Sequence, residues 1–501
     1  MIPFLDKLLR ALFVALAVGF AWGIRGHFGH LIGAMFPGAM LGLAFAYVSG
    51  QKNVIRWAPL LGTLGGLGIA IGGYTSYAVL HGYAQSGPPA PWYNFAYGFA
   101  MLILQGGCWG IFGCAAIGAI LDAKKPSVTK FLELVACIFL AGWLFQFILV
   151  QLIGFHVNPP RSNALFGHIG GAVALLIWLA WNKYQLALRG ALLGFTGFGT
   201  GMMIGRELAN LCRHLEVPWR TDHWVTQMFH FQSVSINHWN IMEITVGLVG
   251  GLIFTLGMLG KKIDECPKDN GYSGLNFMGI LYVLGMIPLL HLFVRTNWQE
   301  TLKHMTNILA QWKAAYPDIT EHLSAETLNA HAGTMANLMI VLGWICAAVW
   351  LYLYYTNRER WNWFPVLALG AVISILDLFL RHYFYNPMLP GIYVDEAKAV
   401  LMVDMRTVSM GIYGLMILYV IIREGLWTHK PLMTAEEKMQ KAPWLMCSIT
   451  CIVIYGCVIG AAFKTNGDVT MKNANTRWPL WEWKLGPFTG EERDVSGNVS
   501  P

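Results

Sequence analysis

The chain has 501 residues, of which 56% are hydrophobic and only 12% are charged. Soluble globular domains carry roughly 25% charged residues. A water-soluble core could not absorb so much apolar surface, so the composition predicts an integral membrane protein whose partner is the lipid bilayer. The formal net charge of +7 does not indicate nucleic-acid binding, because the basic residues lie in short loops between apolar runs, where membrane topology explains them.

Apolar runs near the ~20 residues needed to cross hydrocarbon recur along the chain. They predict an all-α, polytopic transmembrane helix bundle of about 13 spans. The predicted spans are 8–24, 31–49, 58–82, 94–121, 129–154, 163–182, 187–206, 240–260, 274–294, 333–355, 363–382, 405–422 and 444–463. The runs 31–49 and 163–182 are short, so a re-entrant segment is the alternative for each. The first run lacks a small-residue cleavage site, which favours an uncleaved helix over a signal peptide.

Basic residues mark every second loop of this map. The loops predicted to be cytoplasmic, each with at least two basic residues, are Lys52–Arg56, Lys124–Lys130, Lys183–Arg189, Lys261–Lys268, Arg358–Arg360 and Arg423–Lys441. The positive-inside rule then predicts a cytoplasmic N-terminus and an extracytoplasmic C-terminus, in what we expect to be a bacterial inner (plasma) membrane. The long loops 207–239, 295–332 and 383–404 fall outside, which favours a function at the outer face.

A weak self-similarity suggests two related halves. Residues 19–23 resemble 197–201, and Gly38 and Gly42 correspond to Gly247 and Gly251. This pattern predicts two parallel six-helix repeats, 1–186 and 187–430, followed by a final span and tail, 431–501, an arrangement known in some transporters. Chance similarity between glycine-rich apolar helices is the alternative.

The first polar group joins the first two spans at the outer side. Arg25, His27 and His30 lie among glycines there, and Gly26 and Gly29 permit a non-helical backbone. Two alternatives stay open besides a tight interfacial turn. In a helix, His27 and His30 would share a face and could bind a metal with a third ligand from elsewhere. Otherwise Arg25 and exposed amides would form an anion site.

The second polar group ends the seventh span. Arg206 and Glu207 are adjacent there, and Asn210 and Arg213 follow at helical spacing, so that Arg206, Asn210 and Arg213 share one face. This face is either a solvated helix end or part of a binding site.

The third polar group precedes the eighth span and includes His223, a candidate for acid–base chemistry. Glu243 lies just inside that span, where an isolated carboxylate would be costly. A basic partner is therefore expected, either Arg206 or Arg25, in a shared outer vestibule.

The fourth polar group is Asp377 and Arg381, four residues apart in the eleventh span. That spacing lets the two charges neutralise each other as a structural pair, or leaves Asp377 as a proton- or ion-coupled carboxylate. His168, in the sixth span, is interpreted as a packing residue. No phosphate loop, HExxH or GxSxG motif occurs, and the sequence identifies no cofactor.

Two functions compete. A transporter of a small polar, anionic solute would bind it through residues from all four groups: Arg25, His27, His30, Arg206, Glu207, Asn210, Arg213, Glu243, Asp377 and Arg381. A membrane-embedded transferase or hydrolase for a lipid-linked or carbohydrate substrate would draw its catalytic groups from His27, His30, Glu207, His223 and Glu243. A third reading is a subunit of a membrane complex, docked through the long outer loops.

Overall fold

The computed structural model describes the larger part of the chain. The described residues are 3–75, 77–84, 92–122, 124, 127–157, 163–219, 233–236, 238–259, 272–295, 341, 345, 363, 365–374, 400–403 and 405–426. The predicted span 444–463 and most of 333–355 lie outside these residues, as do His223, Asp377 and Arg381. The predictions made for them are therefore untested.

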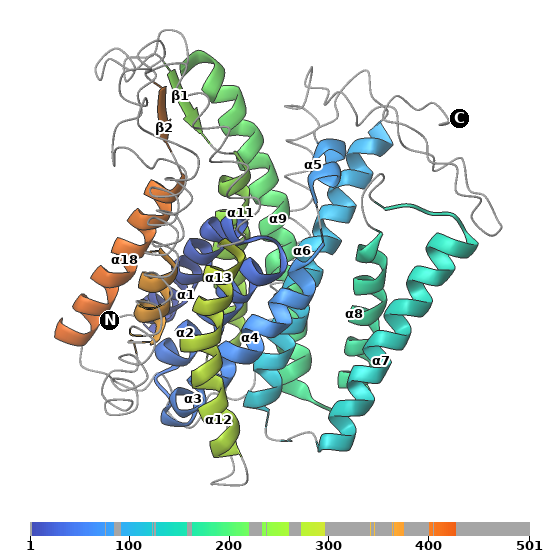
Figure 1. Ribbon diagram of the computed structural model, residues 1–501, viewed down its shortest axis with the longest axis horizontal. Helices are drawn as coiled ribbons and strands as arrows, with labels where there is room; N and C mark the ends of the chain where they lie inside the picture. Colours follow the sequence, from blue (N-terminus) through green and yellow to red (C-terminus); the bar gives the residue numbers. More distant parts are fainter. Residues whose placement is uncertain are drawn as a thin grey trace.

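The described chain is helical apart from one pair of short strands (Figure 1). The α-helices are α1 Pro3–Arg25, α2 Leu31–Ser49, α3 Lys52–Arg56, α4 Ala58–Gly73, α5 Ala78–Ala84, α6 Trp92–Leu121, α7 Val128–Gln146, α8 Ala164–Trp181, α9 Gln185–Trp219, α11 His238–Met258, α12 Tyr272–Leu281, α13 Ile287–Arg295 and α18 Met405–Leu426. The 3-10 helix η1, Gly26–Phe28, links α1 to α2, while the π-helical segments η2, Phe147–Leu152, and η3, Tyr282–Met286, follow α7 and α12.

Seven helices within the described residues are long and apolar enough to cross a membrane, which confirms the membrane character predicted from composition. They are Phe4–Arg25, Leu31–Ser49, Phe95–Leu121, Val128–Leu152, Ala164–Trp181, Trp239–Met258 and Gly274–His291. The larger number of spans and the two repeats stay predictions. The run 31–49 forms one unbroken helix with the expected bounds.

Two predicted segments differ from the structure. The run 58–82 is interrupted, because α4 ends at Gly73 and α5 begins at Ala78. The seventh span was expected to end at 206, yet α9 continues to Trp219, so the first part of the predicted loop 207–239 is helical. The reason is that charged residues such as Arg206 and Glu207 end an apolar run without ending a helix, since both are good helix formers.

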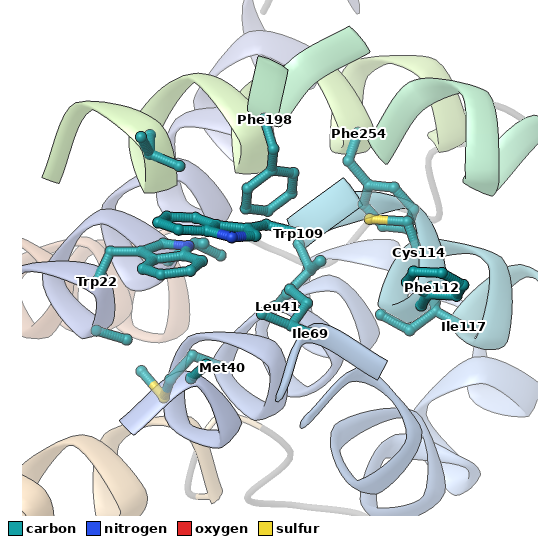
Figure 2. Close-up of a cluster of buried hydrophobic side chains, with 14 of the residues drawn as sticks. Trp22, Met40, Leu41, Ile69, Trp109, Phe112, Cys114, Ile117, Phe198 and Phe254 are labelled. Atoms are coloured by element: carbon teal, nitrogen blue, oxygen red, sulfur yellow. The ribbon is translucent and has the colours of Figure 1, made fainter. Parts of the chain in front are cut away.

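Glycines bring the central helices into close contact. A Cβ added to Gly38 of α2 would meet the carbonyl of Gly65 in α4, and one added to Gly42 would meet the carbonyl of Leu61. Such close backbone approach stabilises membrane helices where lipid supplies no hydrophobic drive. The packed interior contains Trp22, Trp109, Phe198 and Phe254, which Figure 2 shows at the meeting point of several helices.

The helices confirm the predicted all-α class, and one pair of short strands accompanies them. Strand β1, Ser233–Ile236, pairs in parallel with β2, Val400–Val403, and Ser233 lies opposite Val400. Each strand directly precedes a long helix, β1 before α11 and β2 before α18 (Figure 1). The pairing therefore brings the starts of α11 and α18 together, and both helices pack against α1.

The helices α7 and α8 form a hairpin at the edge of the molecule (Figure 1). Helix α8 packs mainly on α7 and touches α6 and α9 over smaller areas. Large apolar side chains of α7, including Phe139, Leu140 and Trp143, are exposed. A surface of this kind suits contact with lipid chains.

Candidate functional site

Arg25, the last residue of α1, is fully buried and forms the centre of a polar cluster. Its Nη1 atom donates to Glu243 Oε1 of α11 at 3.0 Å. Its Nη2 atom donates to the carbonyl oxygen of Gly73 at 2.8 Å and lies 3.0 Å from His30 Nδ1. Because a guanidinium group only donates hydrogen bonds, His30 Nδ1 is the acceptor in that contact. The cluster thus ties the ends of α1, α2, α4 and α11 together.

Two tryptophans lie against the same guanidinium group. The Arg25 Cζ atom lies 4.7 Å from the ring centroid of Trp22 and 4.6 Å from that of Trp109. The two indole rings are stacked (Figure 2), and their centroids lie 4.9 Å apart. A cation over an indole face is attracted by the ring quadrupole, most strongly when both are desolvated. The surroundings of Arg25 are therefore suited to a buried positive charge.

The carboxylate of Glu243 balances the positive charge of Arg25 and accepts a second hydrogen bond. Its Oε1 atom also accepts a 2.7 Å hydrogen bond from the hydroxyl group of Tyr77. A Cβ added to Gly26 would lie 3.1 Å from Glu243 Oε2, so the absence of a side chain at Gly26 leaves room for the carboxylate. A buried carboxylate needs an opposite charge and satisfied lone pairs, and Arg25 and Tyr77 supply both.

Near the break between α4 and α5, backbone carbonyl oxygens lack hydrogen-bond partners within their own helix. Side chains from three other helices lie within hydrogen-bonding distance of them. Gly73 O accepts from Arg25 of α1, and Thr75 O accepts from Gln105 Nε2 of α6 at 2.9 Å. His168 Nε2 of α8 lies 2.8 Å from Ile71 O. The last carbonyls of a helix have no intrahelical partner and carry partial negative charge, so these donors stabilise the interruption.

The second polar group lies on α9, beside the helix that carries Glu243. Arg206 is fully buried, Asn210 is nearly so, and Arg206 Nη1 lies 4.0 Å from Glu207 Oε1. A Cβ added to Gly205 would touch Met242 of α11. The close ion pair of Glu243 is nevertheless formed with Arg25. Of the two partners predicted for Glu243, the structure confirms Arg25.

The structure does not describe the side chains of the remaining predicted site residues. The side chains of His27 and Arg213 lie outside the described part, as do Asp377, Arg381 and His223. Among the described residues no group of three or more His, Cys, Asp and Glu side chains could hold a metal ion. A role in solute binding or catalysis stays a prediction for the described candidates, which are Arg25, His30, Arg206, Glu207, Asn210 and Glu243.

Several residues of the cluster were not predicted from the sequence. Tyr77, Gln105 and Trp109 are uncharged, and uncharged polar residues are common in membrane helices. One signal was available, the stretch Gly72-Gly73-Tyr74-Thr75-Ser76-Tyr77, where glycines and small polar residues interrupt an apolar run. Such a stretch favours a break in the helix.

A second polar network lies at the other end of α1. Arg10 donates from Nε to Asp6 Oδ2 at 2.8 Å and from Nη1 to the carbonyl of Val48 at 2.9 Å. Tyr47 beside it donates to Glu424 Oε1 of α18 at 2.9 Å. Helix α1 is therefore held to α2 at this end, and to α4 and α11 at the end that carries Arg25.

Comparison with protein-family models, with curated proteins and with solved structures found no match to this chain.

Proposed function

We propose that the protein is a multi-pass membrane transporter of a small polar solute that carries an anionic group. The observation that carries this proposal is the interruption between α4 and α5 beside the buried Arg25–Glu243 pair. In secondary transporters, interrupted helices meet at the solute site, where unwound backbone is tolerated because it lines a protein interior. The α1–η1–α2 junction is a second interruption at the same place.

In this proposal Arg25 is the anion-binding residue, and Glu243 occupies it when no solute is bound. An incoming carboxylate or phosphate group would replace Glu243 as the partner of the guanidinium group, which prefers such planar or multidentate anions. Since Glu243 holds α11 to α1, its release would separate those helices at the outer end. The network around Arg10 would hold the inner end of α1 meanwhile. About 13 spans in two parallel halves complete the proposed architecture.

Uptake by proteoliposomes tests this proposal. Purified protein is reconstituted, and accumulation of radiolabelled small carboxylates, phosphate and sulfate is compared with that in empty liposomes. We expect saturable uptake of at least one class of anion, and a loss of at least tenfold in an Arg25→Gln variant, which lacks the proposed anion-binding group. Glu133→Gln is the matched control, because Glu133 forms an exposed ion pair with Lys130 on α7. No uptake of any probe by the wild-type protein, or normal uptake by Arg25→Gln, would refute the proposal.

A second candidate is a membrane-embedded transferase or hydrolase for a lipid-linked or carbohydrate substrate, with His30 and Glu243 as acid–base groups. One observation favours it: the cluster lies at the helix ends, where a large headgroup can reach it, rather than halfway along α1. Against it, Glu243 Oε1 already accepts two hydrogen bonds. Turnover of a lipid-linked sugar without any solute accumulation would favour the enzyme over the transporter.

A further inference from the structure

The buried ion pair between Arg25 and Glu243 carries no net charge. Its two side chains are 0% and 5% exposed, and the groups that bond to them are uncharged. Tyr77 donates its hydroxyl group to Glu243, and His30 is neutral in its contact with Arg25, because its Nδ1 atom accepts there. A solute that carries only an anionic group would therefore add an unbalanced negative charge to this cluster.

Displacement of Glu243 by a solute leaves the charge of Glu243 itself to be balanced. In the proposed function, a solute anion replaces Glu243 as the partner of Arg25. The buried carboxylate of Glu243 then keeps only the hydrogen bond from Tyr77, and a buried charge without a counter-charge is strongly destabilising. A cationic group on the same solute removes that cost, because it becomes the new partner of Glu243.

The second carboxylate oxygen of Glu243 is open to such a partner. Both hydrogen bonds to Glu243, from Arg25 and from Tyr77, go to Oε1. Within the described residues Oε2 accepts none, and a Cβ added to Gly26 would lie 3.1 Å from it. Gly26 belongs to the 3-10 helix η1 and is exposed. Because no side chain occupies that position, an ammonium group, which has three N–H donors, can approach Oε2 there.

An exposed aromatic ring lies one helical turn from Glu243. Trp239 is four residues earlier on α11, so the two side chains share a face of the helix. Its ring centroid is 5.8 Å from that of Tyr77, and the residue is 40% exposed. The face of an indole ring attracts cations. Trp239 therefore favours the approach of a cationic group toward Glu243 from the exposed side.

We propose that the solute is a zwitterion of the amino-acid type, whose carboxylate binds Arg25 and whose ammonium group binds Glu243. This assignment rests on the proposed function, because it names the substrate class of the same site. The solute enters between the two halves of the ion pair, so that each buried charge exchanges one partner for another. Arg25 Nη1 and Glu243 Oε1 lie 3.0 Å apart. A solute with both charged groups on one carbon atom requires the smallest separation of the two.

Thermal unfolding of the purified full-length protein in detergent tests the proposal through binding alone. The melting temperature is titrated with alanine, leucine and phenylalanine. It is also titrated with the matched acids, in which hydrogen replaces the ammonium group, and with the matched amides, which lack the carboxylate. A ligand that binds only the folded state raises the melting temperature. We expect at least one of the amino acids to bind at least tenfold more tightly than its matched acid and its matched amide.

Variants at two positions assign this preference to Glu243. Glu243→Gln leaves Arg25 as a net positive charge, so the preference should reverse and the matched acids should bind more tightly than the amino acids. If Glu243→Gln does not fold, Gly26→Ala tests the same oxygen. Its methyl group lies beside Oε2 and should weaken amino-acid binding at least tenfold. Gly414→Ala is the matched control and should bind as the wild-type protein does, because nothing lies within 4 Å of an added Cβ there.

The outcomes separate the solute class from transport. Matched acids that bind as tightly as the amino acids, or no stabilisation by any of the three amino acids, would overturn the zwitterion site. Tighter acid binding at low pH would also overturn it, because a proton would then balance Glu243. Uptake of any anion by proteoliposomes would leave transport intact in each case. The uptake assay with small carboxylates includes these amino acids, and amino acids that bind without being accumulated would refute transport alone.

Discussion

Arg25 Nη1 lies 3.0 Å from Glu243 Oε1, and the two residues are 218 positions apart in the sequence. Both side chains are buried, at 0% and 5% of their full exposure. Withdrawing two charges from water is costly, and hydrogen bonds from further groups offset part of that cost. Gly73, His30 and Tyr77 supply those groups. The pair is thus a cooperative unit, and its parts can be tested one at a time.

Replacement of Glu243 by Gln should destabilise the protein strongly. The neutral amide leaves the buried Arg25 without a counter-charge, and breaking a buried pair in this way costs about 3–5 kcal/mol. Denaturant unfolding of the purified protein in detergent measures the free energy of unfolding. Glu133→Gln is the control and should change it little, because the Lys130–Glu133 pair is exposed. Equal effects of the two variants would show that the Arg25–Glu243 pair contributes no more than a surface pair.

Removal of the Tyr77 hydroxyl group should also destabilise the protein, but less. Tyr77→Phe keeps the ring and removes one buried hydrogen bond to Glu243, a bond to a charged group that is worth about 1.5–3 kcal/mol. The same unfolding measurement reports the loss. Tyr74→Phe, at a neighbouring exposed position of the same interruption, should be neutral. If Tyr74→Phe costs as much as Tyr77→Phe, the effect comes from the local backbone and not from Glu243.

A methyl group at Gly42 should disturb the packing of α2 on α4. The added Cβ would meet the backbone carbonyl of Leu61, which cannot move aside without shifting α4. Gly42→Ala should therefore lower the melting temperature of the purified protein. Gly414→Ala is the control, because nothing lies within 4 Å of an added Cβ there. Alanine favours a helix over glycine by about 0.5–1 kcal/mol, so the control should be neutral or slightly stabilising. A lower melting temperature for Gly414→Ala than for Gly42→Ala would contradict the close approach of α2 and α4.

The topology inferred from loop charge can be tested at two loop residues. A cysteine at Lys124, between α6 and α7, should react with a membrane-impermeant maleimide only after the cells are permeabilised. A cysteine at His156, between α7 and α8, should react in intact cells. Labelling of the wild-type chain gives the background from its nine native cysteines. Labelling of position 124 in intact cells would invert the map and place the Arg25 cluster at the cytoplasmic side.

The helices themselves could be predicted wherever local sequence decides them. The run 31–49 became α2 with the same bounds, because its length and uniform apolarity fit a spanning helix and little else. The run 58–82 looked similar, but it contains the interruption after Gly73. That interruption is stabilised by Arg25 and Gln105, which approach from other helices. No pattern within the run itself reveals donors that arrive from elsewhere in the chain.

For the site, the position of Glu243 inside an apolar run predicted a cationic partner, and Arg25 and Arg206 were the two candidates. The packing of α1 on α11 selects Arg25, because it brings the two charged groups to 3.0 Å. The contact between His168 Nε2 and the carbonyl oxygen of Ile71 could not be predicted for a similar reason, because that oxygen is a backbone atom that every residue carries. A sequence shows which side chains need partners, whereas the packing of distant helices determines which partners they meet.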